Sequence, residues 1–147
     1  MKIDKTYMAI IKQIRDGRKS YKQIADELAI TENTVRSRVK KLMDEGVLEI
    51  AGLVNPDKLP DHYFLIVGIK LKTMDLVNKG EEFSKLKGVV NVSVVTGRFD
   101  LILTVLLRND FNLLDFYTRE VSTIAEVDFA ETFVVYKNYN VKVPYIL

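Results

Sequence analysis

The stretch from Ser20 to Leu48 constrains the fold of this chain more than any other part of the sequence. It contains two short helical patterns separated by a tight turn. The hydroxyl of Ser20 can accept from the backbone N–H of Gln23 while the Gln23 side chain reaches back, which is a capping box. Thr31 is a suitable N-cap for the second helix. Two short helices joined in this way are typical of a helix–turn–helix.

Apolar residues in both patterns recur at the spacing of a buried helical stripe. In the second pattern, Val35, Val39 and Leu42 lie at i, i+4 and i+7. Ala25, in the first, is small enough to let another helix cross closely. Gly46 stands where a left-handed residue commonly follows a helix. These positions predict a small packed unit whose polar helix faces point outward.

The residues left on the outside of the second helix are chemically suited to DNA. Arg, Asn, Ser and Thr side chains can read base edges, and Lys and Ser can hold phosphates. A solvated surface helix is the alternative, but the capping box, the small residue, the turn and the basic face occur together. The predicted DNA contacts are Ser20, Tyr21, Thr31, Glu32, Asn33, Thr34, Arg36, Ser37 and Lys40.

The distribution of charge agrees with double-stranded DNA as a partner, although the net charge is only +2. Residues 1–50 contain 11 Lys and Arg against 8 Asp and Glu, whereas residues 51–147 contain 11 against 12. Because this excess is modest, we expect DNA affinity to depend on dimerisation and on the placement of individual side chains.

The chain changes character after the third predicted helix, which ends at Gly46; the first begins at Asp4. Residues 48–54 predict one or two short strands, either of a wing or of a linker. Pro56 and Pro60 then mark the passage into a second domain. We therefore expect a helix–turn–helix DNA-binding domain over residues 1–50, a linker strand or hinge over 51–61, and a second domain over 62–147.

From residue 62 onward the hydrophobic period changes to that of strands. Strands are predicted over residues 63–72, 89–96, 101–107 and 127–138, and helices over residues 75–86 and 110–124. The order βαββαβ is the ferredoxin-like arrangement. The predicted fold class is therefore α+β, an N-terminal winged helix–turn–helix domain followed by a βαββαβ ferredoxin-like domain.

Several of these strands are apolar on both faces, as in Phe64 and Ile66 against Leu65 and Val67. A βαββαβ sheet has helices on one face only, and an antiparallel sheet open to water should alternate cleanly. The uncovered face therefore predicts a partner sheet from a second copy of the chain. Scattered surface hydrophobes are the alternative.

The opening residues, from Ile3 to Leu48, resemble the start of the Lrp/AsnC family, the feast/famine transcriptional regulators. The positions that match the family pattern are Thr34, Val35, Arg38, Val39, Leu42, Gly46, Val47 and Leu48. The resemblance continues to the C-terminus and covers nearly the whole chain. It implies sheet-to-sheet dimers that often join into tetramers, octamers or larger discs. It also implies a small effector, usually an amino acid, bound between dimers.

This family commonly has a Gly-x-x-Asp turn beside the effector pocket, and Gly97 and Asp100 match it. Gly97 permits positive φ and exposes backbone N–H groups to a carboxylate, while Asp100 can accept from an ammonium. The alternative is a hairpin whose glycine turns the chain and whose aspartate caps it locally. The predicted effector contacts are Thr96, Gly97, Arg98, Phe99, Asp100 and Thr132.

No catalytic or metal-binding pattern stands out, and no cofactor is expected. His62 is the only histidine and cysteine is absent, which excludes a His–His metal site and a Cys-ligated zinc. Without a long apolar run or a signal peptide, we expect a soluble cytoplasmic protein that does not enter a membrane. Two other functions stay open: a tetrapyrrole decarboxylase, as some relatives of this architecture are, and a stand-alone amino-acid sensor. The basic helix argues against both.

Overall fold

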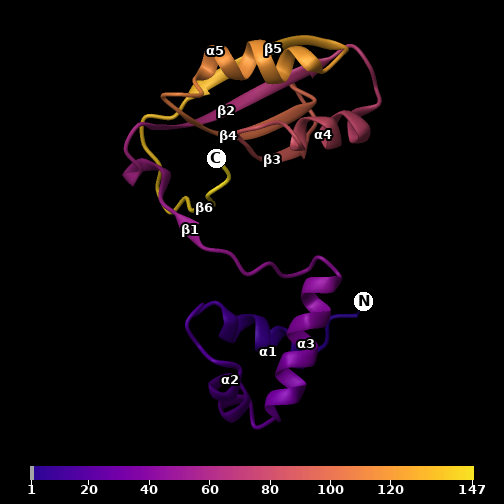
Figure 1. Cartoon of the computed structure of the whole chain (residues 1–147). Coiled ribbons are helices and arrows are strands. Elements are labelled where there is room, and N and C mark those ends of the chain that lie inside the picture. Colours follow the sequence, from indigo (N-terminus) through magenta and orange to yellow (C-terminus); the bar gives the residue numbers. More distant parts are fainter. Residues whose placement is uncertain (1) are drawn as a thin grey trace. The chain divides into compact units, whose positions relative to one another are not determined.

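The computed structural model describes residues 2–147, and the chain divides into two compact units between Ala51 and Gly52 (Figure 1). Each unit has a hydrophobic core of its own. No helix in the described part of the chain is long and apolar enough to cross a membrane.

Three helices form the N-terminal unit, as the sequence predicted: α1 (Lys5–Ile14), α2 (Tyr21–Leu28) and α3 (Glu32–Asp44). A side chain caps the start of each helix, Asp4 on α1, Ser20 on α2 and Thr31 on α3, and the capping box at Ser20 is complete. The core between the helices consists of Ile10, Ile24, Ala25, Val35 and Val39.

Residues with positive φ shape the turns that follow α2 and α3. Ala29 is left-handed, with φ 52° and ψ 43°, and its N–H donates to the carbonyls of Ala25 and Asp26. Gly46 has φ 66°, as is common after a helix. The left-handed conformation costs a residue with a Cβ roughly 1–2 kcal/mol. The turn of the helix–turn–helix therefore stores strain at Ala29, whereas the end of α3 does not.

Of the two alternatives for residues 48–54, the structure shows a linker strand. β1 (Leu53–Val54) pairs antiparallel with β6 (Val143–Pro144), and residues 48–52 form no strand. A 3₁₀ turn over Pro56–Lys58 follows β1. The sequence did not predict β6, because two residues are too short to show a period.

The second unit is built on a four-stranded antiparallel sheet in the order β3-β4-β2-β5, which confirms the βαββαβ prediction. Its strands are β2 (His62–Leu71), β3 (Val89–Val94), β4 (Leu101–Arg108) and β5 (Val127–Val134). Helix α4 (Leu76–Ser84) follows β2. The segment after β4 consists of α5 (Leu113–Asp115), a π-helical turn (Phe116–Glu120) and a 3₁₀ turn (Val121–Thr123).

Two strands end earlier than predicted: β3 stops at residue 94 instead of 96, and β5 at 134 instead of 138. The apolar run continues past Val134, so the hydrophobic period alone does not mark the end of β5. Tyr136, within that run, is 97% exposed. The end of the strand is set by its loss of pairing with β2, which composition does not reveal.

The two faces of the sheet differ in what covers them. On one face, alternate residues of β2 and β4 such as Val67 and Leu103 are buried together with Phe83 and Phe116 from the helical side. On the other face, none of the described helices packs, and Phe129 and Phe133 of β5 are 41% and 43% exposed. The expected apolar face without a helical cover is therefore present.

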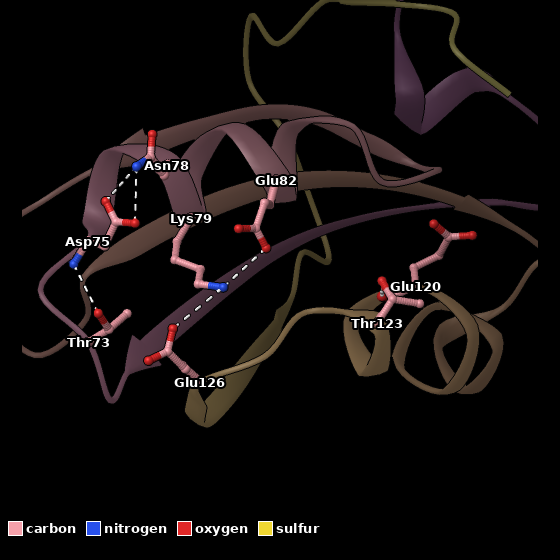
Figure 2. Close-up of polar contacts among 8 residues, drawn as sticks. All are labelled: Thr73, Asp75, Asn78, Lys79, Glu82, Glu120, Thr123 and Glu126. Carbon is pink, nitrogen blue, oxygen red and sulfur yellow. Dashed lines mark hydrogen bonds and ion pairs between the residues drawn. The ribbon is translucent and has the colours of Figure 1, made fainter.

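A buried lysine ties α4 to the turn before β5 (Figure 2). Lys79 Nζ lies 3.2 Å from Glu82 Oε2 and 3.7 Å from Glu126 Oε2. The Lys79 side chain is 9% exposed, whereas those of Glu82 and Glu126 are about half exposed. The lysine stem is thus packed in the unit while both acceptors stay hydrated. Among the described residues, no group of His, Cys, Asp and Glu is suited to hold a metal.

Candidate nucleic-acid interface and effector site

The polar face of α3 carries most of the residues predicted to contact DNA. Glu32, Asn33, Arg36, Ser37 and Lys40 are all exposed. The opposite, apolar stripe of α3 is fully buried, so this polar face cannot turn inward without unpacking the core. Helix α3 therefore presents one continuous polar surface of a kind that fits a DNA major groove.

Arg36 and Lys40 on this face have local, exchangeable partners. Arg36 Nη2 lies 2.7 Å from Glu32 Oε1, and Lys40 Nζ lies 2.6 Å from Asp44 Oδ2. The Arg36 guanidinium also lies 5.4 Å from the centre of the Tyr21 ring at the start of α2. Because the side chains of Arg36 and Lys40 are 61% and 74% exposed, these pairs are weak and can give way to bases or phosphates.

The hydroxyl side chains among the predicted contacts form hydrogen bonds within or at the start of their own helices. Thr31 Oγ1 accepts from the Thr34 N–H at 3.1 Å and lies 2.8 Å from Thr34 Oγ1. Ser37 Oγ donates to the Thr34 carbonyl at 3.2 Å. Ser20 Oγ accepts from the Gln23 N–H at 3.2 Å. The structure thus separates residues that fix the helices from Asn33, Arg36 and Lys40, which project from them.

The turn from Thr96 to Asp100 joins β3 and β4, and Asp100 holds it against β2. Asp100 Oδ1 accepts from Lys70 Nζ and Oδ2 from the Leu71 N–H, both at 2.8 Å, and its own N–H donates to the Ile69 carbonyl at 2.9 Å. The hydrogen bond from Lys70, followed by that from Leu71, lowers the pKa of Asp100. Both carboxylate oxygens therefore already have partners within the chain.

Gly97 turns the chain at the tip of this hairpin. Its φ is 122°, a conformation that favours glycine, and apart from Gly97 and its two chain neighbours no atom lies within 4 Å of the position a Cβ would take. Thr96 and Arg98 on either side are exposed. The role of Gly97 in the turn is thus confirmed, and the space around it is open.

Phe99 leaves the turn and packs on the uncovered face of the sheet. Its ring centre lies 6.1 Å from those of Phe129 and Phe133, at interplanar angles of 61° and 85°. A Cβ on Gly68 would lie 2.7 Å from three carbons of the Phe99 ring. Close approach of the ring to β2 therefore requires glycine at position 68, and the three rings form one aromatic cluster.

Charged groups border this aromatic cluster. Arg98 Nη2 lies 2.9 Å from Glu131 Oε2, and its guanidinium lies 5.5 Å from the centre of the Phe99 ring. Thr132, by contrast, places Oγ1 2.7 Å from Tyr117 Oη, in the helix that covers the other face. The structure therefore brings Arg98 and Phe99 to β5 but not to the side chain of Thr132. Sequence reasoning did not predict Lys70 as a partner of Asp100, because Lys70 lies on another strand, β2.

Comparison with known proteins agrees with both units. Residues 3–49 match the model of the winged helix-turn-helix DNA-binding family, and residues 65–143 match that of the Lrp/AsnC ligand binding domain. The chain belongs to the Lrp/AsnC family. Its second unit matches the ligand binding domain of that family, which is a family of transcriptional regulators.

Individual relatives of this Lrp/AsnC protein align over most of its length. An uncharacterised HTH-type transcriptional regulator of Pyrococcus abyssi is 30% identical over 88% of this chain and 82% of its own. The structure of E. coli AsnC superposes with a TM-score of 0.71 at 25% identity, covering 94% of this chain and 95% of its own. A Neisseria meningitidis regulator, solved in complex with L-Met, gives 0.71 at 20% identity and covers 92% and 91%.

Proposed function

We propose that this Lrp/AsnC regulator reads specific DNA sequences with the exposed face of α3 and that a small molecule, an amino acid or a close analogue, tunes its activity. The observation that carries the proposal is the continuous polar face of α3, on which Arg36 and Lys40 have only weak partners. A tetrapyrrole decarboxylase, or a sensor that does not bind DNA, would not need an exposed polar helix face with cations such as Arg36 and Lys40.

The DNA contacts are tested on fragments selected from the host genome by the purified protein. Arg36→Ala should weaken binding to selected fragments by about 1–3 kcal/mol if Arg36 makes a bidentate base contact. Lys40→Ala should weaken binding to all sequences and lower the salt slope by about 1. Lys85→Ala removes an exposed cation from the second unit and serves as the control. Unchanged affinity of both α3 variants would refute the assignment.

For the effector, the proposed site is the Thr96–Asp100 turn at the border of the aromatic cluster of Phe99, Phe129 and Phe133. Its support is the match of residues 65–143 to a ligand-binding domain and the L-Met complex of the Neisseria relative. Thermal-shift screening against an amino-acid panel that includes L-methionine tests the proposal. Arg98→Gln should abolish any response that the parent shows. A panel without a response from the parent would contradict it.

For assembly, we propose that the uncovered face of the sheet packs against the same face of a second copy. The support is its exposed aromatic surface, which a monomer would leave in water. Light scattering on the full chain tests this proposal. Phe133→Asp should shift the protein toward the monomer, and Val77→Asp, an exposed position on α4, is the matched control. A parent protein that is monomeric at micromolar concentration would rule out the proposed interface.

A further inference from the structure

Arg38 differs from Arg36 and Lys40, two other cations of α3, in where its partner lies. Its Nη1 donates to both carboxylate oxygens of Asp4, at 3.0 Å and 2.9 Å, and its guanidinium lies 4.4 Å from the centre of the Tyr7 ring. Arg36 and Lys40 pair within α3, four residues away. Among the described residues, the Arg38–Asp4 pair is the ion pair that joins α3 to another helix.

Asp4 serves two helices with one carboxylate. Its Oδ1 also accepts from the Tyr7 N–H at 2.9 Å, which caps the start of α1. The bond from the Tyr7 N–H, followed by that from Arg38, lowers the pKa of Asp4, so the carboxylate stays ionised at neutral pH. Tyr7 is buried and packs α1 into the unit. The start of α1 and the flank of α3 are therefore held at one point.

We propose that Asp4 and Arg38 form a positioning pair that fixes the rotation of α3 for base reading, and that Arg38 itself does not contact DNA. This inference rests on the proposed function. The core holds α3 through aliphatic side chains, whose burial is a non-directional interaction, whereas a hydrogen bond depends on distance and angle. A base contact by Arg36 needs donor–acceptor distances near 3 Å. A pair that joins the flank of α3 to α1 supplies that restraint.

The competing role for Arg38 is a phosphate contact that Asp4 masks in the absence of DNA. Asp4→Asn distinguishes the two roles because each predicts a change in DNA affinity of opposite sign. Asparagine caps helices as well as aspartate does, so α1 keeps its start while the ion pair is lost. A masked phosphate contact would gain affinity, because the repelling charge disappears and Arg38 is released. A positioning pair would lose affinity for selected sequences.

The experiment measures binding of the full chain to a selected fragment and to random DNA at several salt concentrations, well below the melting temperature. We expect Asp4→Asn and Arg38→Gln each to weaken selective binding by about 3- to 10-fold, with the double variant no worse than either. The salt slope should not change, and Arg38→Lys should restore part of the loss. Glu27→Gln breaks another ion pair of the same unit, Lys19–Glu27, and should leave the selectivity unchanged.

The outcomes distinguish this inference from the proposed function. A parent protein that binds no fragment selectively overturns both. A selective parent whose Asp4→Asn variant binds more tightly, or as tightly, overturns the positioning role alone. A drop of about one in the salt slope for Arg38→Gln also overturns it, because that drop is the signature of a lost phosphate contact.

Discussion

The absence of a side chain at Gly68 allows the Phe99 ring to pack against β2 on the uncovered face of the sheet. A Cβ at position 68 would overlap the ring, whereas the ring itself can move only by leaving Phe129 and Phe133. We predict that Gly68→Ala lowers the free energy of unfolding by about 1–3 kcal/mol through overpacking. Chemical denaturation followed by circular dichroism measures it.

Gly80→Ala is the control for that substitution. The added Cβ would lie 3.4 Å from Val94 Cγ2, an ordinary contact, and position 80 is inside α4. Alanine in a helix interior is favoured over glycine by about 0.8–1 kcal/mol, so this variant should be as stable as the parent or more so. Equal destabilisation by both alanines would mean that the Phe99 ring is not the cause.

Asp100 gives a second prediction at this scale. Asp100→Asn removes the charge that Lys70 and the Leu71 N–H bind, and we expect a loss of about 1–2 kcal/mol of stability near pH 7. Because folding lowers the pKa of Asp100, its contribution is present above the ordinary aspartate pKa and is lost as the pH falls through the lowered value. The gap between parent and variant should therefore close in acid.

Urea titrations of both proteins across an acidic pH series measure that gap. If Asp100→Asn also abolishes a ligand response while Arg98→Gln does not, the aspartate is a ligand contact and the turn has a second role. A gap that stays constant into strong acid would show that the carboxylate charge does not stabilise the turn.

Among the helices of the N-terminal unit, exchanging alanine and glycine should have opposite effects on stability at the end of α2 and at the end of α3. Ala29 and Gly46 are both left-handed. Ala29→Gly should therefore stabilise the unit by up to about 1 kcal/mol, and Gly46→Ala should destabilise it by about 1 kcal/mol. Thermal melts of the two variants against the parent measure the effect. Two shifts of the same sign would exclude backbone strain as the cause.

The ion pairs of the buried Lys79, on α4, with Glu82 and with Glu126 in the turn before β5 give a prediction about stability. Lys79→Met keeps an unbranched stem in the packed site and removes the charge. Because the side chains of Glu82 and Glu126 are about half exposed, removing the lysine does not leave a buried carboxylate without a partner. We expect a stability change within about 1 kcal/mol for methionine and a larger loss for Lys79→Ala, which deletes the packed stem. Denaturant midpoints of the pair distinguish packing from charge.

Local signals in the sequence were sufficient to predict the elements but not the partners of their side chains. The capping box at Ser20 and the stripe through Val35 are short-range, so the three helices could be predicted. The partner of Arg38 is Asp4, 34 residues away at the start of α1, and the partners of Asp100 lie on β2. Such contacts depend on tertiary packing, which one chain's periodicity does not encode. For the same reason, the sequence did not predict that the Thr132 side chain points to the face of the sheet that the helices cover.

At the scale of the whole molecule, the two separate cores predict two separate responses to mutation. Ile10 and Val35 belong to one core, and Val67 and Phe83 to the other. We expect calorimetry to resolve two transitions, with Ala29→Gly moving only one and Gly68→Ala only the other, because each substitution acts within its own core. A single transition that both variants shift would show that the units unfold together.

The pairing of β1 with β6 has a consequence for how the protein is made. The ribosome completes β1 at Val54 but reaches the β6 residues Val143 and Pro144 only about 90 residues later, a delay of roughly 4–18 s at usual translation rates. The helical unit is complete on the nascent chain well before that. During this interval the strand that follows it has no β6 with which to pair. A nascent chain therefore carries a finished DNA-reading unit while its linker strand is still unpaired.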